Sequence, residues 1–151
     1  PAPRRRPLPV RRRHPAVLLG VAAGGFLGAL ARDQVELAWP TPAGHFPLAT
    51  FVINTSGAFL LGLVLTVAIE RDRTDGRLWR TLRLVVCVGG LGAWTTMSTL
   101  AVESDTLVRA GDAATAAACL AATVAAGLAA AAVGAAAGRL HRLQRRRRGV
   151  A

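Results

Sequence analysis

Long apolar stretches separated by short polar segments dominate this sequence. A membrane-spanning helix needs about 20 mostly apolar residues, and the chain offers four such stretches, at residues 15 to about 39, within 37–69, at 84–102 and at 113–138. Apolar residues make up 52% of the 151 residues, which leaves little sequence for a soluble domain. We therefore predict an all-α membrane protein with four transmembrane helices.

The charged residues lie mainly between these stretches. Seventeen of the nineteen arginines fall in three blocks, at residues 4–13, 71–83 and 139–148. With four spans, the N-terminus, the middle loop and the C-terminus share one side of the membrane, and arginine-rich segments stay in the cytoplasm. We therefore expect cytoplasmic, arginine-rich tails at residues 1–14 and 139–151, on either side of a membrane domain of residues 15–138.

Three other interpretations of the composition are disfavoured. A net charge of +11 fits a nucleic-acid-binding protein, but the arginines flank apolar stretches and no aromatic residues alternate with them, so we expect no nucleic-acid partner. The first 31 residues resemble a secretory signal peptide, yet three further apolar segments follow. Cys87 and Cys119 both fall inside predicted spans, so small core residues are expected there rather than a disulfide.

Small residues inside the spans predict close helix contacts. Gly20, Gly24 and Gly28 recur every four residues, a spacing that lets another helix backbone approach closely. In the last span a second stripe of small or polar residues has the same spacing: Thr115, Cys119, Thr123 and Gly127. Such a stripe either hydrogen-bonds a neighbouring helix or lines a polar path, and the spacing leaves both interpretations open.

Polar groups inside the second and third spans predict an ion site. The carboxamide of Asn54 must find partners inside hydrocarbon, either in an interhelical hydrogen bond or along a pathway. The third span contains GGLGAWTTMSTL at residues 89–100, in which three glycines precede Thr95, Thr96, Ser98 and Thr99. Glycines free the backbone, and hydroxyls can satisfy the groups that a helix break exposes. We therefore predict a broken third helix and a candidate ion site beside it.

These segments resemble the CrcB/Fluc family of small bacterial fluoride channels. The matching segments are GGFLGALAR (24–32), FPLATFVINTSGAFLLG (46–62), GGLGAWTTMSTLAVE (89–103) and the last span with Thr123 and Gly127. The resemblance implies an antiparallel dual-topology dimer in the bacterial plasma membrane, with two narrow fluoride pores and a structural sodium ion at the dimer interface. It also implies passive, potential-driven export of fluoride. No catalytic or phosphate-binding motif accompanies these segments, so we expect no enzymatic activity.

The resemblance also assigns individual residues. Asn54 matches the pore-lining asparagine of the family, whose amide would donate to a dehydrated fluoride ion. The backbone carbonyls of Gly92 and Thr95 match those that hold the sodium ion, which is not transported. The other pore positions that the resemblance implies are Arg32, Thr96, Met97, Ser98, Leu100, Cys119 and Thr123. Cys119 stands where tyrosine is usual, and Arg32 is either a vestibule residue or a snorkelling interface anchor.

Two departures from the family bear on the dimer. Met97 and Leu100 stand where the family has phenylalanines, whose electropositive ring edges can attract an anion, whereas aliphatic side chains cannot. A pore built from two copies of this chain would therefore lack the aromatic contacts. A chain that inserts in both orientations also needs nearly balanced loop charges, and here the arginines lie on one side. We expect a heterodimer with an oppositely oriented paralogue that keeps the phenylalanines.

Two rival functions fit parts of the sequence. The chain is a non-conducting subunit that orients its partner if Met97 and Leu100 abolish conduction, although Asn54 and the threonine-rich segment oppose this. A small four-span multidrug exporter instead needs a titratable carboxylate within a span. Asp33 and Glu36 lie towards the end of the first span, and the sequence places no acid deep in the other three.

Overall fold

The computed structural model describes residues 15–42, 44–72 and 76–149, and within these ranges all regular structure is helical. The elements are α1 (Pro15–Ala38), α2 (Leu48–Asp72), α3 (Gly76–Arg83), the π-helical η1 (Leu84–Leu91), α4 (Gly92–Trp94), α5 (Met97–Arg109) and α6 (Ala113–Arg148). Four segments are long and apolar enough to cross a membrane: Pro15–Ala38, Leu48–Ile69, Leu78–Arg109 and Ala113–Gln144. The predicted four-span, all-α fold is confirmed, and the chain is a multi-pass membrane protein.

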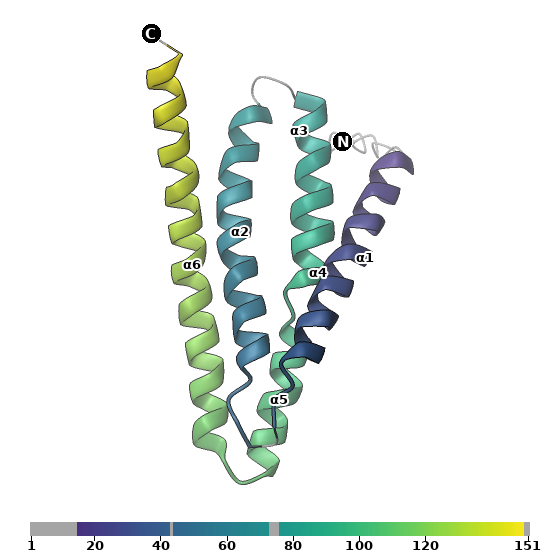
Figure 1. The fold of residues 1–151 in the computed structure, drawn as a ribbon, viewed down its shortest axis with the longest axis vertical. Helices are drawn as coiled ribbons and strands as arrows, with labels where there is room; N and C mark the ends of the chain where they lie inside the picture. The colour runs from purple at the N-terminus through teal and green to yellow at the C-terminus, as the bar shows by residue number, and fades with distance from the viewer. Residues whose placement is uncertain (1–14, 43, 73–75, 150–151) are drawn as a thin grey trace, which may run out of the picture.

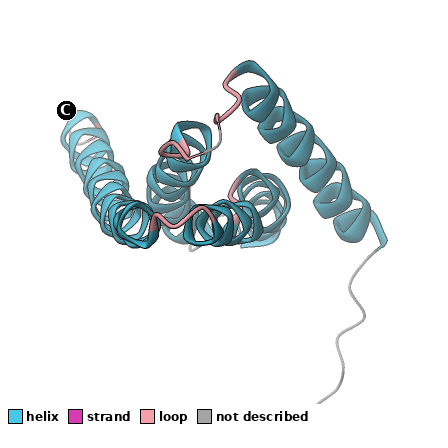
Figure 2. Cartoon of the chain, turned by 90° about the horizontal axis from the view of Figure 1, so that it is seen from below, coloured by secondary structure: helices cyan, strands magenta, loops and turns pink. Residues whose placement is uncertain are grey.

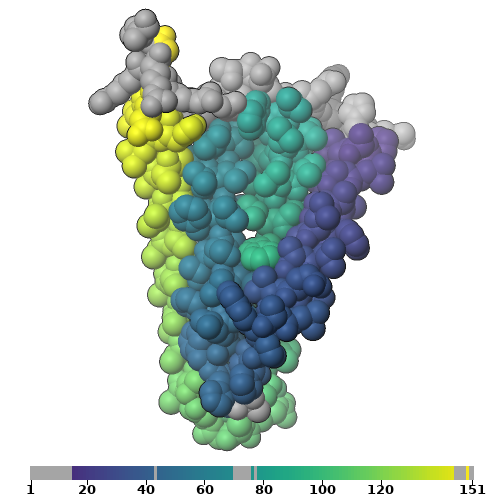
Figure 3. Space-filling view, viewed as in Figure 1, coloured from purple at the N-terminus to yellow at the C-terminus, as the bar shows by residue number. Residues whose placement is uncertain are grey.

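The helices form two pairs that splay apart. α2 lies alongside α6, and α1 leans against η1 (Figure 1). Seen from below in Figure 2, α1 and α6 lie at opposite sides of the arrangement. The space-filling surface is hollowed between the upper parts of α2 and α3 (Figure 3). Many large apolar side chains, such as Leu19, Phe26 and Leu128, are exposed, as expected where helices face lipid.

Glycines set the contact between α1 and η1. A Cβ atom on Gly24 would lie 2.6 Å from the Val85 carbonyl oxygen, and one on Gly28 would collide with the Gly90 carbonyl. The two backbones therefore touch without intervening side chains, which is how small residues hold helices together in lipid. The packing role predicted for the stripe that begins at Gly20 is confirmed.

Small residues also fix the register between α2 and α6. Gly62 faces the Ala131 carbonyl, and Gly127 faces Ala58. Both helices run in the same direction in Figure 1, so residues of α6 lie level with residues of α2 that come about 69 positions earlier. This register places Thr123 level with Asn54.

The third span is broken, as predicted, but not at its glycines. Gly89 and Gly90 belong to η1, and Gly92 keeps right-handed helical angles. The extended residues are Thr95 (φ −74°, ψ 148°) and Thr96 (φ −140°, ψ 118°). The glycines therefore make room for α1, whereas the hydroxyl-bearing residues form the break.

Candidate ion site at the broken third helix

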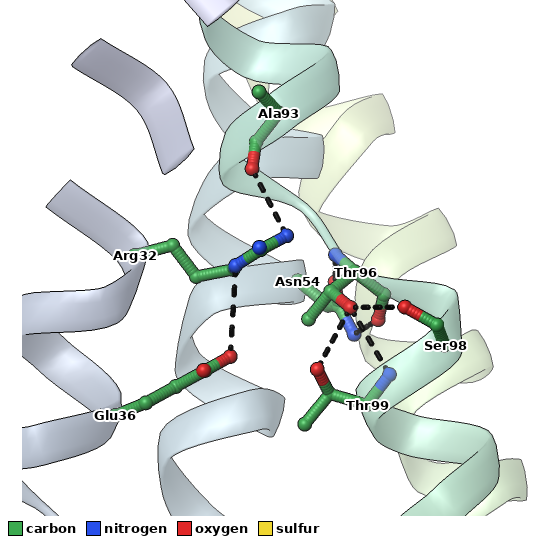
Figure 4. Close-up of polar contacts among 7 residues, drawn as sticks. All are labelled: Arg32, Glu36, Asn54, Ala93, Thr96, Ser98 and Thr99. Atoms are coloured by element: carbon green, nitrogen blue, oxygen red, sulfur yellow. Dashed lines mark hydrogen bonds and ion pairs between the residues drawn. The ribbon is translucent and has the colours of Figure 1, made fainter. Parts of the chain in front are cut away.

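Asn54 of α2 holds the backbone at the break (Figure 4). Its Nδ2 donates to the Thr96 carbonyl at 2.9 Å, and the Thr96 N–H donates to Asn54 Oδ1 at 2.8 Å. The carboxamide thus satisfies a donor and an acceptor that the broken helix can no longer pair. Because an amide nitrogen carries two hydrogens, one N–H of Asn54 has no acceptor among the described residues and can donate to a further one.

Hydroxyl groups satisfy the first turn of α5. Thr96 is its N-cap: Oγ1 accepts from the Thr99 N–H at 3.1 Å and donates to Thr99 Oγ1 at 2.9 Å. Ser98 Oγ lies 3.2 Å from Thr96 Oγ1. A threonine N-cap stabilises a helix start by typically about 1 kcal/mol. The prediction that hydroxyls satisfy the break is confirmed.

Close approach of α2 joins Ser56 to Trp94 at the break, a contact that the sequence interpretation missed. A Cβ atom on Gly57 would collide with the Thr95 methyl group and lie 2.9 Å from Trp94 Cδ1. The Trp94 Nε1 donates to Ser56 Oγ at 3.1 Å. The run of asparagine, threonine, serine and glycine in residues 54–57 was the available signal, since small polar residues allow such contacts in a span.

The break also releases backbone carbonyls. In a continuous helix the Gly92 carbonyl would accept from the Thr96 N–H, which here donates to Asn54. The Thr95 carbonyl would accept from the Thr99 N–H, which donates to Thr96 Oγ1 instead. Unwound carbonyls of this kind coordinate sodium in membrane proteins. Gly92 and Thr95 therefore offer the donor chemistry that a sodium ion requires.

Arg32 connects α1 to the same break. Its Nη1 donates to the Ala93 carbonyl at 3.2 Å, and its Nε lies 3.7 Å from Glu36 Oε1, one turn further along α1 (Figure 4). The side chain is 29% exposed. The sequence left two roles open for Arg32, a vestibule residue and a snorkelling interface anchor. Its contact with the backbone at the break favours the vestibule role.

Glu103 of α5 is a further acidic residue, and it lies near Glu36. The helical segment of the candidate third span reaches Arg109, further than the predicted end at residue 102, so Glu103 lies in this segment, towards its end. Its carboxylate is close to the Thr50 hydroxyl and to Glu36, but neither Thr50 Oγ1 nor Glu103 Oε2 has a hydrogen-bond partner among the described residues. Glu103 thus lies towards the end of the candidate third span, and the absence of an acid deep in the later spans stays a prediction.

The remaining predicted pore residues lie in unlike surroundings. Leu100 is 1% exposed, whereas Met97 is 68% exposed. Cys119 is fully buried and packs with Leu107 and Ala116 between α5 and α6. Thr123 is 5% exposed, and its Oγ1 has no hydrogen-bond partner among the described residues. The structure therefore brings together Arg32, Asn54, Gly92, Thr95, Thr96 and Ser98, whereas Met97, Leu100 and Cys119 make no polar contact with them.

Known proteins share these segments. The profile of the family described as CrcB-like protein, Camphor Resistance (CrcB), matches residues 19–135. The fluoride-specific ion channel FluC 2 of Nocardia farcinica is 44% identical over 97 residues, which cover 64% of this chain and 66% of that protein. FluC 3 of Streptomyces avermitilis, also named a fluoride-specific ion channel, is 45% identical over 104 residues, covering 67% of this chain and 48% of that protein. This chain thus spans about two thirds of the first relative and about half of the second. Since the matched profile covers most of the four-span domain, the chain belongs to the CrcB-like protein family.

Proposed function

We propose that this chain is a subunit of a fluoride-selective ion channel in the bacterial plasma membrane. Its relatives carry the name of such a channel, and four spans suit an integral channel subunit. The observation that carries the proposal is the broken third helix, where Asn54 pairs with Thr96 and keeps one amide N–H for an anion.

Fluoride would pass beside this break by exchanging water for fixed donors. The second N–H of Asn54 and the Thr123 hydroxyl, neither of which has a partner among the described residues, are donors. Arg32 supplies a positive charge. Closely placed donors favour a small anion that must shed its hydration shell. Whatever the orientation of the chain, an inside-negative potential drives fluoride export by about 2.3 kcal/mol per charge for each 100 mV.

A structural sodium ion would bind the carbonyls of Gly92 and Thr95. Sodium bound there would neutralise the partial negative charges of these oxygens and hold the two halves of the third span in place. The loss of both helical donors supports this assignment. The ion is expected to stay bound during fluoride passage.

We further propose an antiparallel heterodimer with an oppositely oriented paralogue. Seventeen arginines flank one side of the spans, a bias that opposes insertion in both orientations. Met97 is 68% exposed, so this position is open to a partner, yet it carries no aromatic ring. A partner that keeps the phenylalanines would supply the missing ring edges.

Fluoride efflux from liposomes tests both proposals. This chain and the proposed paralogue are reconstituted separately and together, and circular dichroism checks that each is folded. We expect efflux from the mixture and little from this chain alone. Rapid efflux from this chain alone would contradict the obligate heterodimer, and a folded mixture without efflux would contradict the channel itself.

The rival function, a non-conducting orienting subunit, is favoured by the burial of Leu100 and the aliphatic side chain of Met97. Thr123→Val separates the two, because this hydroxyl has no described partner and its loss breaks no described hydrogen bond. If this chain conducts, the variant in a mixed dimer lowers fluoride efflux. Thr66→Val, which removes only a bond to the Gly62 carbonyl within α2, is the matched control. Unchanged efflux with Thr123→Val would favour the orienting role.

A further inference from the structure

An apolar groove lies between α2 and the α3–η1 segment, next to the middle arginine block. Its volume is about 300 Å³, and Figure 3 shows the surface hollowed between these helices. Leu63 and Val67 form one wall, and Leu82 and Val86 form the other. Its walls therefore suit a hydrocarbon chain better than a polar ligand.

The guanidinium of Arg83 places a positive charge at this groove. Arg83 lines it and lies inside the candidate span Leu78–Arg109. No hydrogen bond or ion pair joins its guanidinium to a side chain that the structure describes, a set that leaves out the side chains of residues 70–75. A cation inside hydrocarbon is costly unless it pairs with an anion or reaches the headgroup layer. Trp79 also lines the groove, and tryptophan is enriched at that layer.

We propose that this groove binds an anionic phospholipid, with one acyl chain between α2 and η1 and the headgroup phosphate on Arg83. A guanidinium pairs with a phosphate through two parallel hydrogen bonds. Five arginines between residues 71 and 83 strengthen the attraction, since each basic residue near the surface favours anionic lipid. A zwitterionic lipid would place its acyl chain against the same walls, but its headgroup would bring a second positive charge beside Arg83.

Native mass spectrometry of the full-length chain tests this proposal without any fluoride measurement. The protein is equilibrated in detergent with equal amounts of phosphatidylglycerol and phosphatidylcholine that carry identical acyl chains. We expect preferential retention of phosphatidylglycerol, and a roughly fivefold lower preference in Arg83→Gln. Arg83→Lys should keep most of the preference. Arg109→Gln is the matched control, because Arg109 is exposed and pairs with Asp105 at 2.7 Å.

A second pair of variants tests the groove itself. Val67→Trp fills it and should lower the retention of both lipids, whereas Val124→Trp, at a 53% exposed position on α6, should not. Equal retention of the two lipids by the unaltered protein overturns the proposal, as does a preference that survives Arg83→Gln. If Val67→Trp changes the oligomeric mass without loss of lipid, the groove is a contact with another chain and the lipid assignment is wrong.

Discussion

Replacing Asn54 by leucine should destabilise the fold as well as stop fluoride passage. Leucine has a similar volume but leaves the Thr96 N–H and carbonyl without the partners that now lie 2.8 and 2.9 Å away. Each buried group left unsatisfied costs about 1–3 kcal/mol, so the free energy of unfolding should fall by about 2–6 kcal/mol. Hydrocarbon offers no water to replace the lost partners.

Reversible unfolding in mixed micelles, followed by far-ultraviolet circular dichroism, measures this loss. Thr66→Val is a suitable reference, because its hydroxyl bonds the Gly62 carbonyl inside the same helix at 2.8 Å and that carbonyl keeps its helical donor. A change below about 1 kcal/mol relative to this reference would refute the reasoning that Asn54 replaces the missing helical bonds. If fluoride efflux then still fell, the carboxamide would act on the ion and not on the helix.

Three further predictions test other parts of the structure. Gly28→Ala should lower thermal stability because its methyl group meets the Gly90 carbonyl, whereas Gly25→Ala, with 3.9 Å to the nearest atom, should be neutral or stabilising. Leu100→Phe, at a 1% exposed position, should lower the free energy of unfolding by about 1–3 kcal/mol in a denaturant titration. Met97→Phe should leave this free energy unchanged and raise fluoride efflux. A larger loss of stability in Met97→Phe than in Leu100→Phe would contradict the burial of these two side chains. Hydrogen bonds from the Thr115 side chain and backbone hold the pKa of Asp112 below its ordinary 3.8. The ionised Asp112 carboxylate therefore stabilises the fold above pH 3.8, and this stabilisation is lost as the pH falls through the lower pKa of the folded state. Thermal melts at several pH values should show this loss in the unaltered protein and not in Asp112→Asn.

The candidate site could be predicted in part. Asn54 and the hydroxyl segment were identifiable because polar groups are rare inside apolar spans and need partners there. Ser56 and Trp94 were missed, because nothing local indicates that an indole N–H reaches a hydroxyl 38 positions away. Glu103 was assigned to the connection after the third span, whereas the helix continues past it to Arg109, because a helix need not end where its most apolar stretch ends.

The number of spans and the separation of charged from apolar segments could be predicted from the order of residues alone. Both are local properties, since a bilayer tests each stretch for length and apolarity independently of its neighbours. The stripe of Gly20, Gly24 and Gly28 likewise predicted a close helix contact, though not with which helix.

The position of the break in the third helix, and the choice of which neighbouring side chain is buried, depend on the packing of helices against each other. The break falls at Thr95 and Thr96 because Asn54, 42 positions earlier than Thr96, lies where it can pair with that backbone. Leu100 is buried and Met97 exposed because α5 starts at the break and turns one of its faces inward. Such outcomes depend on how α2 and the third span lie against each other, which apolarity along the chain does not specify.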